Sequence, residues 1–365
     1  MNILKYFFFL ILLFTACVKT IEPIVIEKAI DGLYAKKEKV ETHDLGKGKL
    51  SEYGFFIGAL NQLTPANNNV IPYELNSPLF SDYADKKRFI VLPKNTTIKY
   101  DPREVLDFPV GTTLVKNFYY TAENLEQSDS NIIMETRLLI KEKDLTWTAL
   151  PYVWNEEQTD AYLSILGKKL QVARRDKKEL APFEYATPDM NQCKSCHMKA
   201  NQAHPIGPSA RQLNRDNTFG KITHNQLDYL IEQGFLVGLE NSTAAPKMVN
   251  YADAHTASIN DRARAYLDIN CAHCHRVDGS ARNTALYLDY DEMDEVDFGI
   301  NKHPISAGQG SGNLNWDIVK GAPEKSILAY RMKHTDPNIM MPEMGKKLVH
   351  QEGVALIEQW IREMD

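Results

Sequence analysis

The stretch "RARAYLDINCAHCHR", residues 262–276, joins a helical pattern to a cluster of three chemically reactive side chains. Small and apolar residues recur at intervals of three and four, which places them on one face of an α-helix. We expect this helix to begin near Asn260 or Asp261, either of which can cap its first turn. The residues expected on one face are Ala263, Tyr266, Leu267, Asn270, Cys271 and Cys274.

The same five-residue pattern occurs once more, as "CKSCH" at residues 193–197. Thr187, Pro188 and Asp189 precede it in the order of an N-cap, a proline in the first turn and an acid that favours the helix dipole. The sequence therefore predicts a second short helix that carries the second copy of the pattern.

The pattern Cys-x-x-Cys-His is the signature of covalent c-type haem attachment. Its two thiols add to the two vinyl groups of one haem, and the histidine that follows binds the iron. The chain has five cysteines, and the two motifs use four of them. We therefore expect two haem c groups. The expected attachment residues are Cys193, Cys196, Cys271 and Cys274, and the expected iron ligands are His197 and His275.

Other readings of paired cysteines fit less well. A four-cysteine zinc site is typical of pairs separated by about 15–20 residues, and Cys196 and Cys271 are much further apart. A thioredoxin-like redox pair does not require a histidine after the motif. Two structural disulfides suit an exported protein, but they do not explain why a histidine follows each cysteine pair.

The second haem needs a further iron ligand, and the segment "NIMMPEMGKKLVHQEGVALIEQWI" at residues 338–361 offers methionines. It is similar to class I cytochromes c, in which a methionine beside a proline precedes the C-terminal helix. Met341, followed by Pro342, is the expected ligand, and Met340 and Met344 remain alternatives. Ligation by Met and His raises the reduction potential of a haem. The apolar stripe expected on the following helix is Gly353, Ile357, Trp360, Ile361 and Met364.

The first haem is less well defined by the sequence. Pro208 in "PIGPSARQLN" resembles the class I cytochrome proline whose carbonyl accepts a hydrogen bond from the proximal histidine, a contact that orients the ring. Candidates for the distal ligand are Met248, His224 and His204. An iron with an open sixth position is a further alternative.

The N-terminus has the pattern of an export signal. Residues 1–17 contain Lys5, an apolar run and a small-residue site directly before Cys17. This pattern resembles the lipobox of bacterial lipoproteins, so Cys17 is the expected lipidation site. Residues 18–50 are expected to form a polar tether. We therefore expect an exported lipoprotein, periplasmic or associated with the outer membrane and held to the membrane by its lipid.

The rest of the chain indicates a multi-domain β + α fold. Residues 51–185 contain short runs of β-branched and aromatic residues between turn signals, which predicts a β-sandwich-like domain. We expect two small all-α modules, similar to class I cytochrome c, to follow at residues 186–255 and 256–365. The net charge of −6 does not resemble that of a nucleic-acid-binding protein.

The combined motifs resemble a family of bacterial di-haem c-type cytochromes, often lipoproteins, whose role is poorly defined. The resemblance spans most of the mature chain and implies a β-rich region followed by haem-bearing modules. His350 departs from it, because related C-terminal helices often begin with an aspartate cap. The segments that carry the resemblance are "VIPYELNSPLFSDYADKKRFI", "FPVGTTLVKNFYY", "LPYVWNEEQTDAYL", "NQCKSCH", "PIGPSARQLN", "RARAYLDINCAHCHR" and "MMPEMGKKLVHQEGVALIEQWI".

The expected function is electron transfer in the cell envelope by a membrane-tethered carrier, with redox proteins as partners and no substrate of its own. One alternative is a di-haem peroxidase, which needs an open distal position at one haem. Another is a ligand-binding β module whose attached cytochrome supplies electrons to a partner.

Overall fold

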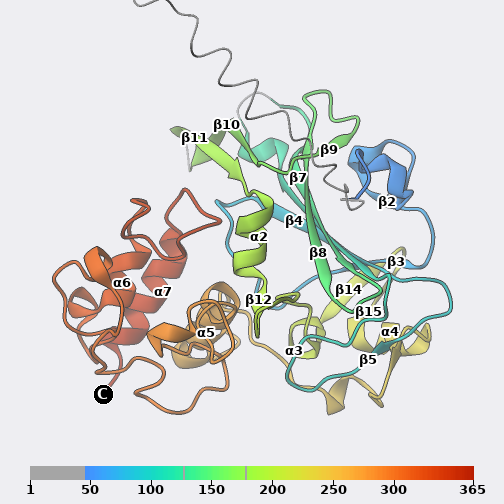
Figure 1. Cartoon of the computed structure of the whole chain (residues 1–365). Coiled ribbons are helices and arrows are strands. Elements are labelled where there is room, and N and C mark those ends of the chain that lie inside the picture. Colours follow the sequence, from blue (N-terminus) through green and yellow to red (C-terminus); the bar gives the residue numbers. More distant parts are fainter. Residues whose placement is uncertain (1–45, 126–127, 177–178) are drawn as a thin grey trace, which may run out of the picture. The chain divides into compact units, whose positions relative to one another are not determined.

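A six-stranded antiparallel sheet organises the first half of the described chain. The computed structural model describes residues 46–125, 128–176 and 179–365 (Figure 1). All neighbouring strands of this sheet are antiparallel, and sequence neighbours are mostly spatial neighbours. In spatial order the strands are β3 (Val70–Tyr73), β4 (Asp85–Val91), β6 (Thr113–Tyr120), β7 (Ile132–Lys141), β8 (Trp147–Trp154) and β9 (Ala161–Leu163).

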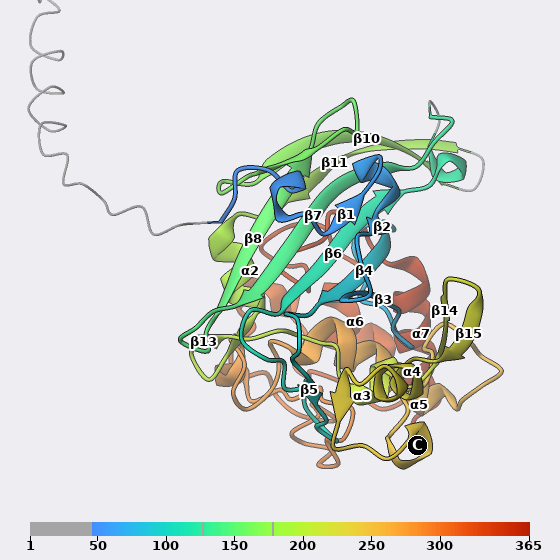
Figure 2. The ribbon, with the colours of Figure 1, turned by 90° about the vertical axis from the view of Figure 1, so that its right-hand side faces the viewer.

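Successive side chains of a strand point to opposite faces of the sheet, and apolar residues at every second position make one face apolar. Phe89, Val115, Leu138 and Leu150 form a continuous cross-strand row on this face. Residues 50–63 cover the row, and Figure 2 shows this blue segment in front of the strands. This segment also holds β1 (Phe56–Ile57), which pairs with β2 (Thr64–Pro65), and the short 3-10 helices η1 (Ser51–Tyr53) and η2 (Leu60–Gln62).

Residues from much later in the chain pack against the opposite face of the sheet. Ile90 and Leu114 on this face share a buried cluster with Leu213, Leu227 and Leu236. These three leucines lie in or near α3 (Ala210–Leu213), α4 (Gln226–Glu232) and β16 (Leu236–Val237), and β16 pairs in parallel with β5 (Ile98–Lys99). The remaining hairpins are β10 (Lys168–Asp176) with β11 (Glu179–Thr187), β12 (Met198–Lys199) with β13 (Gln202–Ala203), and β14 (Asp216–Phe219) with β15 (Ile222–Asn225).

The helices of the last hundred residues pack around a separate buried cluster. Gly353 lets two of them approach closely, because a Cβ at this position would lie 2.3 Å from the hydroxyl of Tyr266. The expected apolar stripe of the last helix is buried at Gly353, Ile357, Trp360 and Ile361. The helices are α5 (Ile259–Leu267), its π-helical continuation η5 (Asp268–Ala272), α6 (Ile327–Met332) and α7 (Gln351–Arg362).

The expected fold class is wrong. Strands β3, β4, β6, β7, β8 and β9 form one sheet, and residues 50–63 cover the face that carries Phe89, so this part is not a two-sheet sandwich. Residues 186–255 are not an all-α module, because their three helices are four to seven residues long and alternate with five short strands. Helices this short bury little apolar surface by themselves, so they pack on the sheet instead. Residues 256–365 add three α-helices, joined by long irregular segments, to give six α-helices in the described residues.

Residues 46–365 form one compact unit, and the boundaries expected at residues 185 and 255 fall inside it. Asp82, at the start of the sheet region, shows the connection directly. Its Oδ1 accepts hydrogen bonds of 2.7 Å from the backbone N–H groups of both Lys347 and Leu348. The expected signal peptide, the lipidation site Cys17 and the tether up to residue 45 lie outside the described residues.

Candidate haem site

A cavity of about 470 Å³ lies beside the second motif. Cys271, Cys274 and His275 contribute to its wall, so the structure brings the three expected site residues to one space. Apolar side chains make up much of the remaining wall. Cavities of roughly 300–1,000 Å³ with apolar walls and few polar groups are typical of cofactor sites. The apolar residues of the wall include Leu286, Leu288, Ile318, Ile327, Leu328 and Val354.

Helix α5 and the π-helical turn after it position this motif. Ser258, not Asn260 or Asp261, caps α5, and its side chain accepts a hydrogen bond from the N–H of Asp261. The helix widens at Asp268–Ala272, a feature that is frequent at functional sites. The backbone N–H of His275 then donates to the carbonyl of Cys271 at 2.9 Å, which holds the motif in a tight turn.

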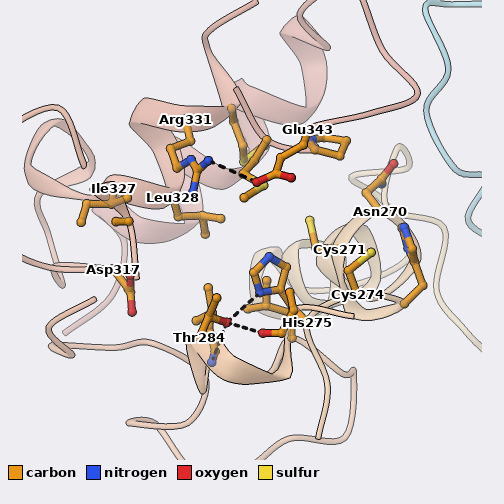
Figure 3. A pocket seen from close by; sticks show the side chains of 18 of the residues that line it. Asn270, Cys271, Cys274, His275, Thr284, Asp317, Ile327, Leu328, Arg331 and Glu343 are labelled. Atoms are coloured by element: carbon orange, nitrogen blue, oxygen red, sulfur yellow. Dashed lines mark hydrogen bonds and ion pairs between the residues drawn. The ribbon is translucent and has the colours of Figure 1, made fainter. Parts of the chain in front are cut away.

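The His275 ring projects into the cavity, and only 9% of this residue is exposed to solvent (Figure 3). Its Nδ1 lies 3.3 Å from the hydroxyl of Thr284, which fixes the orientation of the ring. Arg331 and Glu343 lie across the cavity from the ring, with 3.9 Å between Nη2 of Arg331 and Oε1 of Glu343.

The methionine segment supplies part of the same wall. Met341, Pro342 and Met344 all line the cavity, whereas Met340 is buried beside it and is not part of the lining. The backbone N–H of Met341 donates to the carbonyl of Arg331 at 3.1 Å, so α6 holds this loop in place. The arrangement thus favours Met341 and Met344 over Met340 as ligands.

The first motif lies on α2 (Met190–Cys196) and directly after it. Asp189 caps this helix together with Gln192, whose backbone N–H donates to Oδ1 of Asp189 at 2.8 Å, while Thr187 belongs to β11. The cap is therefore two residues later than expected. The Nδ1 atom of His197 lies 3.0 Å from the carbonyl oxygen of His204. A cavity of only about 80 Å³ adjoins His197 and His204.

The carbonyl expected beside His197 was that of Pro208, but the structure places a different group there. The Pro208 carbonyl accepts a hydrogen bond from the N–H of Leu106 at 3.2 Å. The backbone carbonyl of His204 faces Nδ1 of His197, so His204 lies on the side of the ring away from any iron bound through Nε2.

The other two distal candidates of the first haem lie elsewhere. Met248 is 1% exposed and packs in the cluster formed around α5 and α7. His224 lies on β15, where its Nε2 is 3.0 Å from a carboxylate oxygen of Glu232. Neither residue lines either of the two motif cavities.

The two motifs meet in space. The thiols of Cys196 and Cys274 lie near each other at the wall of the larger cavity, and both Cys196 and His273 line both cavities. Glu104 links the two segments that follow the motifs. One of its carboxylate oxygens lies 2.7 Å from Nζ of Lys199, and the other lies 2.9 Å from Nη2 of Arg276. Burial opposes the ionisation of Glu104, but these two hydrogen bonds prevail and lower its pKa to about 2.

Burial shifts the pKa values of the two expected histidine ligands and of the Cys271 thiol. It lowers the pKa of His197 to about 4 and also lowers the pKa of His275, so both imidazoles are neutral at pH 7. Burial raises the pKa of the Cys271 thiol to about 12. A neutral imidazole has a lone pair available for iron.

The residues around the second motif fit a haem. Two thiols and a histidine share one wall, a thioether lies in the methionine segment, and the space between is apolar. At the first motif the three residues of the signature are in place, but the adjoining cavity is much smaller. Across the described residues no three His, Cys, Asp or Glu side chains gather as ligands for a metal ion, so a four-cysteine zinc site is not assembled.

Sequence reasoning missed several residues near the motifs. Glu104 comes from the sheet region and has no motif around it. Lys116 and Arg137 lie on β6 and β7, close enough to His197 to contribute, after burial, to the lowering of its pKa. The charged residues inside the otherwise apolar strand segments "TTLVKNFYY" and "METRLLIK" were the only available signal for Lys116 and Arg137.

Comparisons with known proteins do not assign this chain to a family. No family model, curated protein or solved structure matches this chain. None of the helices in the described residues combines the length and the apolar composition needed to span a bilayer.

Proposed function

We propose that this protein is a di-haem c-type cytochrome that transfers electrons. The observation that carries the proposal is the second-motif cavity, where Cys271, Cys274 and His275 share one space with Met341. These four residues would hold one haem, the cysteines through covalent bonds and the other two through iron. Cys193, Cys196 and His197 would hold a second haem in the same way.

A bound haem supplies an iron that takes up and releases one electron. The chain's own residues set the conditions for this exchange. Apolar side chains such as Leu288 and Ile318 exclude water from the cavity. Thr284 orients the His275 ring, and a methionine ligand favours the reduced state and therefore a high potential.

The contact between the motifs supports exchange between the two sites. Cys196 and Cys274 line one cavity, so residues that would attach the two haems adjoin each other. Two haems held by these neighbouring residues would supply the redox chemistry that a carrier between two redox proteins requires. Export and membrane anchoring through Cys17 rest on the sequence of residues 1–17 alone and stay part of the proposal.

The deciding experiment is to co-express the full chain with haem-attachment machinery and to measure haem per chain and the absorption spectrum. Two covalent haems, with the long-wavelength band of Met–iron ligation, would support the proposal. A chain that attaches no haem under conditions that mature a control cytochrome would refute it. Two haems with a high-spin component and turnover of hydrogen peroxide would favour the peroxidase alternative.

A further inference from the structure

Residues 77–83, which lie between β3 and β4, cross from the sheet region to the helices of the last hundred residues. The hydroxyl of Tyr251 donates to the carbonyl of Pro78 at 2.9 Å, and Tyr251 belongs to the cluster around α5 and α7. Further along, the Tyr83 hydroxyl accepts a hydrogen bond of 3.0 Å from the N–H of Gln351, the first residue of α7. We call residues 77–83 the strap, because both of its ends are tied to these helices.

The strap forms part of the wall of the second-motif cavity. Phe80 lines the cavity, and its backbone N–H donates to Oδ1 of Asn270 at 2.8 Å. Asn270 directly precedes Cys271 and lines the same cavity (Figure 3). The Phe80 ring also stacks on the ring of His350, the residue before α7, with 4.2 Å between the ring centres. The strap therefore contacts both the segment that carries the cysteines and the start of the last helix.

Asp82 connects the strap to the methionine segment. It is 4% exposed, and its Oδ1 accepts hydrogen bonds of 2.7 Å from the backbone N–H groups of Lys347 and Leu348. The Tyr120 hydroxyl of β6 donates to the backbone carbonyl of Asp82 at 2.8 Å. Asp82 also has a positive φ of 49°, a conformation that costs free energy in a residue other than glycine and is frequent where a site constrains the chain. The sheet, the strap and the methionine segment are thus joined at one residue.

The part of the methionine segment that lines the cavity is held at two points. One is the hydrogen bond from the N–H of Met341 to the carbonyl of Arg331, and the other is the pair of hydrogen bonds to Asp82. Within the described part of the chain, residues 342–346 form no backbone–backbone hydrogen bond and belong to no helix or strand. The position of Met341 is therefore set by these two anchors and not by regular secondary structure.

We propose that Asp82 is a positioning residue for the second haem, which holds the methionine segment so that Met341 stays bound to the iron. This inference rests on the proposed function, because it requires a haem at Cys271, Cys274 and His275. A small nitrogen ligand such as imidazole competes with a methionine thioether for the same position on the iron. Residues that support a ligand without touching the metal change affinities by about 10- to 100-fold when they are replaced.

The test is an imidazole titration of the oxidised full-length holoprotein, followed through the long-wavelength Met–iron band. Met341→Leu should lack this band, which assigns it to the second haem. Asp82→Ala removes the acceptor of both hydrogen bonds, so imidazole should displace the methionine at about one tenth of the concentration that the wild type requires. Circular dichroism under the same conditions shows whether the variant is folded.

Asp228→Ala is the matched control. The Asp228 carboxylate also holds a loop, because it accepts hydrogen bonds of 2.7 Å and 2.6 Å from the N–H and the hydroxyl of Ser242. It lines neither motif cavity. Its replacement should lower the stability of the fold and leave the imidazole concentration at half-displacement unchanged.

Two further variants examine the anchor itself. Asp82→Asn keeps an oxygen acceptor at the position of Oδ1 and should require the same imidazole concentration as the wild type. If Asp82→Ala does not accumulate, Tyr120→Phe carries the test, because it removes the hydroxyl that fixes Asp82 to β6. We expect a smaller shift in the same direction, and an unchanged titration of Tyr120→Phe would then count against the inference.

Three results would overturn the inference and leave the cytochrome proposal standing. The first is a wild-type titration in an Asp82→Ala protein that carries both haems. The second is an equal shift in Asp228→Ala, which would mean that a general loosening of the fold is responsible. The third is a shift in Asp82→Asn as large as that in Asp82→Ala, which would assign the effect to charge and not to the hydrogen bonds. Failure of the wild-type chain to attach haem would instead refute the proposed function.

Discussion

Cys196 and Cys274 line the same cavity, and their thiols lie near each other, although they belong to different motifs. This proximity is supported from outside the motifs. The N–H of Ala200, after the first motif, donates to the carbonyl of Asp278, after the second, at 2.8 Å. Glu104 adds ion pairs to both segments. The two sites therefore form one centre and not two separate modules.

The first prediction follows from this thiol pair. In the haem-free chain, expressed without attachment machinery, a diazene oxidant such as diamide should link Cys196 to Cys274. Both thiols lose a hydrogen to the oxidant and one S–S bond forms, because these two cysteines line one cavity and their thiols lie near each other. Peptide mapping by mass spectrometry without reductant identifies the linked pair.

Cys196→Ala should abolish this link, whereas Cys193→Ala should leave it in place, because Cys193 is a buried residue of α2 and is not one of the two linked thiols. Disulfides confined to each motif, between Cys193 and Cys196 and between Cys271 and Cys274, would contradict the observed proximity.

The second prediction concerns the methionine of the second haem. Met341→Leu keeps the apolar volume but removes the thioether, so the holoprotein should lose the long-wavelength Met–iron band and its high potential. Met344→Leu is the matched control, because Met344 lines the same cavity. We expect the control to keep the band. A band lost in Met344→Leu and kept in Met341→Leu would reverse the assignment.

The contiguous parts of the candidate site could be predicted from the sequence. Each motif carries its cysteines and histidine within five residues, so local spacing alone predicts the haem-attachment chemistry that we propose for them. Met341 could be identified because it stands beside a proline before an amphipathic helix. The apolar stripe of α7 could also be predicted, because a helical repeat of 3.6 residues can be recognised in the local sequence alone.

The features that were missed depend on contacts between distant segments. The carbonyl beside His197 belongs to His204, because the β12–β13 hairpin folds back onto the motif, and a two-residue strand leaves almost no sequence signal. Arg88, Lys116 and Arg137 form a row only in the observed register of three strands. A shift of one residue would place these side chains on the opposite face.

The expected modules were wrong for a related reason. Residues 186–255 contain apolar residues that suit short helices, and this pattern predicts a small all-α module. Leu213, Leu227 and Leu236 instead complete a cluster with Ile90 and Leu114 of the sheet. Apolar periodicity shows that a face is buried, but it does not show against which element it is buried.

The third prediction concerns the close contact between α5 and α7. Gly353→Ala should destabilise the protein by about 1–2 kcal/mol. A methyl group would meet the Tyr266 hydroxyl at 2.3 Å, and overpacking of this kind outweighs the gain of up to about 1 kcal/mol in helix propensity. Urea unfolding followed by circular dichroism gives the difference. Gly48→Ala is the control, because no atom lies within 4 Å of its added Cβ, and it should change stability little.

The fourth prediction concerns the pH dependence of the Glu104 contacts. The folded-state pKa of Glu104, about 2, is below its ordinary value of 4.5. Ionised Glu104 therefore stabilises the folded state fully above pH 4.5, and this contribution is lost as the pH falls from 4.5 toward 2. Because 42% of the Glu104 side chain is exposed, we expect Glu104→Gln to cost only about 1 kcal/mol at pH 7.

The measurement is the difference in unfolding free energy between wild type and Glu104→Gln at several pH values. It should be largest at neutral pH and should shrink steadily below pH 4.5, because protonated Glu104 and glutamine are both uncharged. The exposed Glu156, replaced by glutamine, serves as the control and should show little difference at any pH. A difference for Glu104→Gln that stays constant from pH 7 to pH 3 would mean that the carboxylate's charge does not hold the two motif segments together, and that only its shape and packing matter.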